Sequence, residues 1–168
     1  MPFPNDPEVA CRPDGVSFEV LRDAFYWGQV DSWRIPRGFV TDFATIPAVV
    51  SWAIPKLGAY TQAAIVHDYF CSVGIAAGEI SARDTDAVFR RIMRELDVDI
   101  VTRWLVWVGV RWGAVFNPIR RPEWCKDAPA VLGLTALAAP VIVPASLLAV
   151  GGRLVLRAAS SVARLFRR

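Results

Sequence analysis

The spacing of apolar and polar residues predicts strands in the first part of the chain and helices in the rest. Short apolar or aromatic runs occupy residues 16–21, 24–27 and 32–35, and glycine or proline follows two of them. Runs of this kind predict two or three antiparallel strands. From residue 60 onward the apolar residues recur at helical spacing, which predicts helices over residues 60–73, 81–96 and 100–116. The fold class predicted for this part is α+β, with a small antiparallel helical core.

The second predicted helix carries an acidic residue close to its apolar face. Asp86 precedes Phe89 by three residues and Met93 by seven, so it lies near the side that faces the core. A carboxylate in that place is costly unless it is paired. His67, the only histidine, lies on the preceding helix, and two antiparallel helices joined by a short loop would place it opposite Asp86. The pair is interpreted either as a catalytic dyad, with His67 as base and Asp86 as its orienting group, or as a structural link between two helices.

The C-terminal quarter has a different composition. Residues 128–152 are 25 consecutive uncharged residues, enough to cross a bilayer core of about 30 Å. Pro129, Pro140 and Pro144 argue against one straight, uninterrupted helix and favour a kinked span or a hairpin-like insertion. Residues 153–168 alternate arginine with apolar residues and resemble a basic amphipathic helix. The predicted organisation is therefore a domain over 1–127, a hydrophobic membrane segment over 128–152 and a basic tail over 153–168.

The distribution of charge supports lipid as the partner of this C-terminal part. Residues 1–127 carry 14 Lys and Arg against 16 Asp and Glu, a net charge of 14 − 16 = −2, whereas residues 128–168 carry five Arg and no acid. A basic segment beside a long apolar run suits an anionic membrane surface, and the chain has no base-reading motif, so nucleic acid is not expected. A packing helix inside an oligomer is the alternative, and the oligomeric state stays open.

Several classes of site are disfavoured by the residues present. Cys11, Cys71 and Cys125 lack CxxC spacing, so neither a zinc site nor a disulfide framework is expected, and we interpret them as free thiols. A metal-dependent HD phosphohydrolase needs more than one histidine, and the chain has only His67, so this class of enzyme is not expected. Cys71 lies one turn after His67, near the end of the predicted helix, where a nucleophilic cysteine is not expected. No phosphate-binding glycine loop is found.

A third acidic residue suggests a cation site. Residues 38–47, GFVTDFATIP, place Asp42 in a turn-rich stretch that offers carboxylate and carbonyl oxygens. Asp68, adjacent to His67, projects about 100° around the helix from it. Asp42, a neighbouring carbonyl and Asp68 are hard oxygen ligands of the kind that calcium binds.

Three motifs, GFVTDFATIP, AAIVHDY and DTDAVF, occur in this order and resemble a family of small phage and prophage proteins of unknown function. The family pattern is a GF-x-TD-F-AS-IP stretch, an HDY helix and a later D-x-x-F helix. The resemblance covers roughly residues 16–116 and leaves residues 128–168 outside it. It implies a phage-encoded protein, in the virion or the host envelope, with phage structural proteins among its expected partners.

The same pattern is more distantly similar to prokaryotic secreted phospholipase A2. That resemblance implies calcium bound by Asp42, the Phe43 carbonyl and Asp68, with His67 as the base that deprotonates a water and Asp86 as its orienting partner. The water would attack the sn-2 ester of a phospholipid. The chain departs from the pattern at Cys71, where the group has Tyr, and it lacks the paired cysteines and the glycine-rich calcium loop of the animal type. These departures bear on catalysis more than on the fold.

The sequence thus leaves two functions. The first is a calcium-dependent lipid-ester hydrolase acting at a membrane. The second is a non-catalytic phage structural or accessory protein, associated with the tail, entry or lysis, which keeps His67, Asp68 and Asp86 as a polar clamp.

Overall fold

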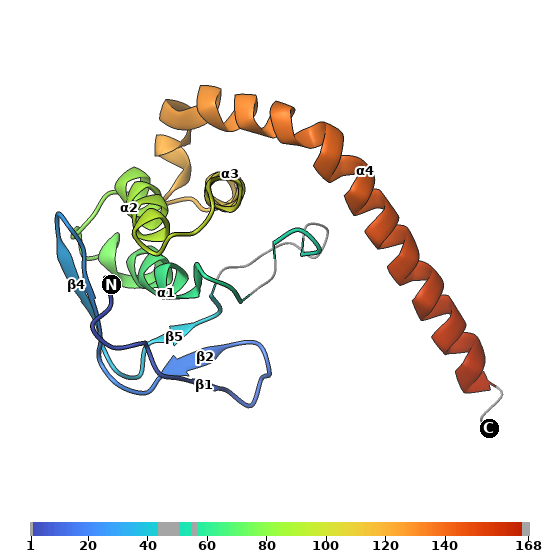
Figure 1. The fold of residues 1–168 in the computed structure, drawn as a ribbon, viewed down its shortest axis with the longest axis horizontal. Coiled ribbons are helices and arrows are strands. Elements are labelled where there is room, and N and C mark those ends of the chain that lie inside the picture. The colour runs from blue at the N-terminus through green and yellow to red at the C-terminus, as the bar shows by residue number, and fades with distance from the viewer. Residues whose placement is uncertain (1, 44–50, 55–56, 166–168) are drawn as a thin grey trace.

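The computed structural model describes residues 2–43, 51–54 and 57–165, and its strands precede its helices (Figure 1). Within the described residues, five short strands form a three-stranded antiparallel sheet of order β1-β2-β5 and a separate β3-β4 hairpin. The strands are β1 Val9–Cys11, β2 Phe18–Val20, β3 Ala24–Trp27, β4 Ser32–Ile35 and β5 Val40–Thr41. The predicted α+β class is confirmed. The sequence predicted fewer strands because β1 and β5 are three and two residues long, too short to show an alternating pattern.

The helices follow in the predicted order. They are α1 Thr61–Tyr69, the π-helical turn η1 Phe70–Gly74, α2 Ala82–Glu95, α3 Ile100–Val115, the 3-10 turn η2 Arg121–Glu123, and α4 Trp124–Leu165. Ser81 caps α2 by accepting a hydrogen bond from the Asp84 amide, and Asp99 caps α3 in the same way through Thr102. The helix predicted over 60–73 is present, but its last turn is widened to η1.

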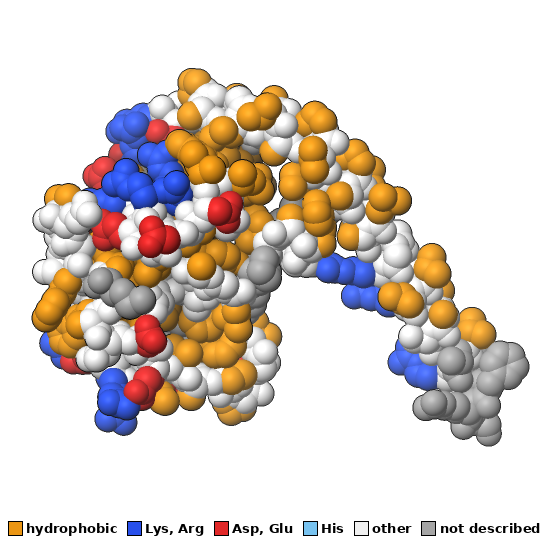
Figure 2. Space-filling view, in the orientation of Figure 1, with side chains coloured by type: hydrophobic (Ala, Val, Ile, Leu, Met, Phe, Trp, Pro, Cys, Tyr) orange, Lys and Arg blue, Asp and Glu red, His pale blue; other side chains and the backbone are white. Residues whose placement is uncertain are grey.

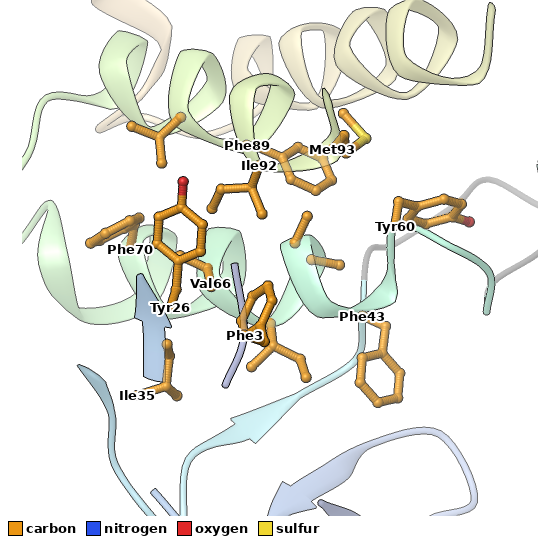
Figure 3. Close-up of a cluster of buried hydrophobic side chains, with 14 of the residues drawn as sticks. Phe3, Tyr26, Ile35, Phe43, Tyr60, Val66, Phe70, Phe89, Ile92 and Met93 are labelled. Atoms are coloured by element: carbon orange, nitrogen blue, oxygen red, sulfur yellow. The ribbon is translucent and has the colours of Figure 1, made fainter. Parts of the chain in front are cut away.

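One hydrophobic core lies between the strands and the first two helices. Tyr26 from β3, Val66 from α1 and Phe89 from α2 are buried, and Figure 3 shows α1 between the strands and α2. Phe89 belongs to the predicted core face of α2, of which Ile92 and Met93 are also buried. The core thus fixes α1 against α2, and this contact positions the candidate site.

The last helix, α4, extends well beyond this domain (Figure 1). It is one continuous helix of 42 residues that contains Pro129, Pro140 and Pro144, and Figure 1 shows it curving. The sequence left a kinked span and a hairpin-like insertion open. Among the described residues α4 continues through all three prolines and curves, which agrees with the kinked span and not with the hairpin. By length and composition α4 is long enough and apolar enough to cross a membrane, and only 11% of its most apolar stretch is buried.

Candidate functional site

The side chains of His67 and Asp86 join α1 to α2 inside the domain. Nε2 of His67 lies 2.8 Å from Oδ1 of Asp86, and the two side chains are 6% and 0% exposed. Ala63 and Ala64, on the same stripe of α1 as His67, are fully buried. Their small size lets another element come close to this side of α1. The predicted pairing of His67 with Asp86 is confirmed as a contact, and the catalytic roles of the two residues stay predictions.

Asp86 also accepts hydrogen bonds from two arginines that the sequence did not predict at the site. Nη1 of Arg111 donates to Oδ2 of Asp86 at 2.8 Å, and Nη2 of Arg120 donates to Oδ1 at 2.5 Å. The Arg111 side chain is 0% exposed and that of Arg120 10%. Asp86 is therefore the centre of a buried ionic cluster that ties α2 to α1, to α3 and to the segment after α3. Burial of three charges is tolerable here because each carboxylate oxygen has at least one donor.

The sequence carried one signal for this cluster. Arg111 follows the apolar helical stretch Leu105–Val110 and precedes Trp112 and Gly113, so it is a single charge within an apolar part of the helix. A lone arginine on such a helix needs an acidic partner when it is buried, and Asp86 needed a partner for the same reason. Arg120 gave no comparable signal, because it lies in a connection with other basic residues.

The same cluster reaches the first turn of α4. Nη2 of Arg111 donates to the backbone carbonyl of Glu123 at 3.1 Å and lies 3.3 Å from Oδ2 of Asp127. Asp127 also pairs with Arg83 of α2 at 3.0 Å. The base of α4 is thus held to α2 and α3 by charge as well as by packing.

The ring of His67 is enclosed by an aromatic side chain and a thiol. The ring of Phe89 lies 4.6 Å away, centroid to centroid, and Sγ of Cys71 lies 3.6 Å from Nε2 and 3.9 Å from Nδ1. Burial lowers the pKa of His67, but hydrogen bonding with Asp68 and Asp86, and the contact with Cys71, together raise it well above its ordinary value. A raised pKa makes the neutral imidazole a stronger base but leaves most of His67 protonated at neutral pH, so a reaction that uses the neutral form should speed up as the pH rises toward this pKa.

Asp42 and Asp68 line one surface pocket beside this pair. The pocket has a volume of about 290 Å³ and is lined by Ser17, Val40, Thr41, Asp42, Asp68, Cys71 and Ser72. It forms here because β5 pairs with β2, with Thr41 opposite Phe18, and β5 also packs on α1. Nδ1 of His67 lies 3.8 Å from Oδ1 of Asp68, so the nitrogen that Asp86 does not occupy lies beside a residue of the pocket wall.

Phe43, whose carbonyl is the third predicted calcium ligand, is the last described residue before the gap at 44–50. Its backbone N–H donates to Oγ1 of Thr41 at 3.0 Å, and its ring is buried against Phe18, 4.5 Å between centroids. Its φ of 65° is in the left-handed region, which non-glycine residues adopt rarely. Phe43 is not among the residues that line the pocket. Residues 44–47, the end of the GFVTDFATIP motif, lie outside the described part of the chain.

The side chains of the pocket fit a hard cation. Asp42, Asp68 and the hydroxyls of Ser17, Thr41 and Ser72 supply oxygen. Thr41 donates to Oδ2 of Asp68 at 2.5 Å, and Oδ1 of Asp68 faces Nδ1 of His67 at 3.8 Å. Among the described residues no group of three or more His, Cys, Asp or Glu side chains is placed to hold a metal ion. Two carboxylates with neutral oxygens suit a weakly bound calcium ion whose remaining ligands are water or substrate.

A second pocket is larger but lies away from this chemistry. It measures about 650 Å³ and lies between the β3-β4 hairpin and the start of α2, where Trp33, Glu79, Asp84 and Arg91 are among its lining residues. Neither His67 nor any other predicted site residue lines it. The smaller pocket is therefore the one relevant to the predicted site.

Acid should weaken the fold through Asp86. Burial alone would raise the pKa of Asp86, but its hydrogen bonds to His67 and Arg111 and the charges of His67 and Arg120 lower it from 3.8 to about 2. The unfolded chain takes up this proton first, so the stability that Asp86 contributes is present above pH 4 and is lost between about pH 4 and pH 2. We expect a loss of about 2 kcal/mol from this group. Urea unfolding of the wild type at several pH values between 4 and 2 should show this fall in the free energy of unfolding. If the free energy of unfolding of Asp86→Asn falls equally steeply with pH, Asp86 is not the cause.

The fold and site together define an α+β domain with a buried, arginine-held His–Asp pair next to an oxygen-lined pocket. Comparison with known proteins places the chain in a family described as Protein of unknown function (DUF1353), to which it belongs through residues 18–110, more than half its length. This match includes His67, Asp68, Asp42 and Asp86, whereas Arg111, Arg120 and α4 lie beyond it. No curated protein and no solved structure matches the chain.

Proposed function

We propose that the chain is a calcium-dependent lipid-ester hydrolase with a mechanism like that of phospholipase A2, acting at a membrane. The observation that carries the proposal is the 2.8 Å contact between His67 and Asp86, next to a pocket whose wall includes both Asp42 and Asp68. A base held by a carboxylate, with further carboxylates on one side, is the arrangement that such hydrolysis needs.

His67 is the proposed general base. Because Asp86 accepts at Nε2, the proton of the neutral imidazole belongs on that nitrogen, and the lone pair belongs on Nδ1, beside Asp68. Nδ1 takes a proton from the attacking water, and Asp86 stabilises the resulting imidazolium. Arg111 and Arg120 keep Asp86 ionised and fix its orientation. Calcium, when held by Asp42 and Asp68 with the Phe43 carbonyl, would polarise the ester carbonyl and stabilise the developing oxyanion.

Calcium binding is expected to be weak and to depend on both pocket carboxylates. With two carboxylates and neutral oxygens, we expect a Kd of roughly 10⁻⁴ to 10⁻³ M in calorimetric titration of the full chain. Asp42→Asn and Asp68→Asn should each weaken binding by at least about tenfold, because each removes half of the negative charge in the pocket. Asp97→Asn, an exposed acid in the turn after α2, is the matched control. Binding that survives both pocket substitutions would contradict the assignment of this site.

The activity itself is tested with phospholipid vesicles. The purified full chain should release fatty acid in the presence of calcium and stop when a calcium chelator is added. No release by folded, vesicle-bound protein would reject the hydrolase.

A non-catalytic role is the second candidate, and the two arginines favour it. Asp86 is bonded to Arg111 and Arg120 as well as to His67, so the cluster has a structural use without any reaction. In this role the domain is a phage structural or accessory protein and α4 engages the membrane. It predicts that His67→Ala lowers stability and that the chain needs no calcium. The phage origin rests only on the resemblance of the three motifs.

A further inference from the structure

One side of α4 is turned toward the rest of the protein between Val131 and Ala149. Between Val131 and Ala149 the buried or half-buried residues recur every three or four positions, and the residues between them are exposed. The shielded residues are Val131, Leu134, Thr135, Ala138, Ala139, Ile142, Ala145, Ser146 and Ala149. This spacing follows one face of an α-helix. We call it the inner stripe.

Hydrogen bonds from distant segments end on this stripe. Nε1 of Trp112 in α3 donates to Oγ1 of Thr135 at 3.0 Å, and Nε1 of Trp52 donates to Oγ of Ser146 at 3.0 Å. Further along, Nη2 of Arg153 donates to Oγ of Ser51 at 2.9 Å. The three positions on α4 are 11 and 7 residues apart, close to three and two helical turns, so they share one face. The domain is therefore attached to α4 along a single side.

The basic residues of α4 continue the same side. Arg157 and Arg164 follow Arg153 at helical spacings of four and seven residues. Figure 2 shows basic side chains on the margin of this part of α4 that faces the domain. Contacts with the domain and positive charge thus lie on one side of the helix.

The other sides of α4 are exposed and apolar. Large residues there are between 37% and 78% exposed: Leu132, Leu137, Val141, Val143, Leu147, Leu148, Val150, Leu154, Val155 and Val162. Pro129, Pro140 and Pro144 differ from Ser146 by 17, 6 and 2 residues, which at 100° per residue places them 100° to 160° from it, away from the inner stripe. An apolar surface of this length facing solvent needs a partner.

We propose that α4 lies along the surface of an anionic bilayer, with its exposed apolar sides among the acyl chains and the domain on its aqueous side. If α4 crossed the bilayer, lipid would surround the helix and separate the domain from the inner stripe. The hydrogen bonds from Trp52 and Trp112 would then be broken, or their partners on α4 would be buried in hydrocarbon. Lying flat preserves all three hydrogen bonds and leaves Arg153, Arg157 and Arg164 at the level of anionic headgroups. This inference uses the membrane location of the proposed function but does not need catalysis.

The depth of neighbouring α4 residues in the bilayer tests the orientation. Single cysteines at Leu147 and Leu148, on the exposed side, and at Ala145 and Ala149, on the inner stripe, would carry nitroxide labels in a full chain whose native cysteines are serine. The vesicles contain ether-linked phosphatidylcholine and phosphatidylglycerol with a chelator, so no hydrolysis takes place. We expect labels at Leu147 and Leu148 deep in the acyl region and those at Ala145 and Ala149 near the headgroups. A depth that changes smoothly through all four positions would mean that α4 crosses, and would overturn the proposal.

A matched pair of charge substitutions provides the second readout. Val155→Lys and Ser160→Lys add the same charge at exposed positions on different sides of α4. Partition onto the anionic vesicles should weaken by about tenfold or more in Val155→Lys and stay at least as strong in Ser160→Lys. Equal losses would overturn the proposal. The proposal would also be overturned if the chain associated with itself and did not bind the vesicles, because a second copy would then cover the apolar sides of α4.

Discussion

Asp86→Asn is expected to lower the free energy of unfolding by about 3 to 5 kcal/mol. Asparagine keeps the shape of the side chain but removes the charge, which leaves the buried Arg111 and Arg120 with no carboxylate between them. A loss of this size is a large share of the roughly 5 to 15 kcal/mol that stabilises a typical domain. Chemical denaturation at neutral pH measures it directly.

Asp97→Asn is the control for this substitution. Asp97 is exposed in the turn after the same helix, with a φ of 55° that asparagine tolerates well, so the same chemical change should alter stability by less than about 0.5 kcal/mol. The coupling can also be measured, since Arg120→Met should cost less in the Asp86→Asn background than in the wild type. Purely additive losses would mean that the ion pair does not stabilise the fold.

His67→Gln is expected to reduce calcium-dependent release of fatty acid by at least about 100-fold, because general-base catalysis contributes roughly 10² to 10⁴ in rate. Glutamine retains an N–H that can donate toward Asp86, so the cluster keeps a partner at this point and the chain should stay folded. Initial rates with phospholipid vesicles, together with denaturation curves of the same samples, separate the two effects.

Asp97→Asn should keep the wild-type rate in the same assay. A His67→Gln chain that is as active as the wild type would remove His67 from the mechanism. A different outcome would be that neither the wild type nor any variant releases fatty acid and that His67→Ala lowers stability. The buried cluster would then be a structural clamp, as in the non-catalytic role.

Local patterns in the sequence predicted most of the helical fold. Ser81 and the apolar residues after it located α2, because a cap and a helical stripe are short-range signals. The His67–Asp86 contact was also predictable, since a buried carboxylate on one helix and a lone histidine on the preceding one each need a partner. The π-helical turn η1, which follows α1 and contains Cys71, left no such signal.

The rest of the site depends on contacts between distant residues. Arg111 and Arg120 reach Asp86 from 25 and 34 residues away, and helix periodicity cannot indicate which carboxylate such arginines meet. The continuity of α4 was predicted only as one of two alternatives, a kinked span beside a hairpin-like insertion, for a different reason. Each proline removes one hydrogen bond from the helix, but all three lie away from the side that holds the domain, so the helix bends and continues.

The position of the bond that is cleaved tests the central claim most directly. The full chain would be given vesicles of a phospholipid with different acyl chains at sn-1 and sn-2, with calcium, and the products identified by mass spectrometry. The account predicts release of the sn-2 acid with the matching sn-1 lysophospholipid, and loss of both products in His67→Gln. Intact phospholipid after incubation with folded, vesicle-bound, calcium-loaded protein would contradict it.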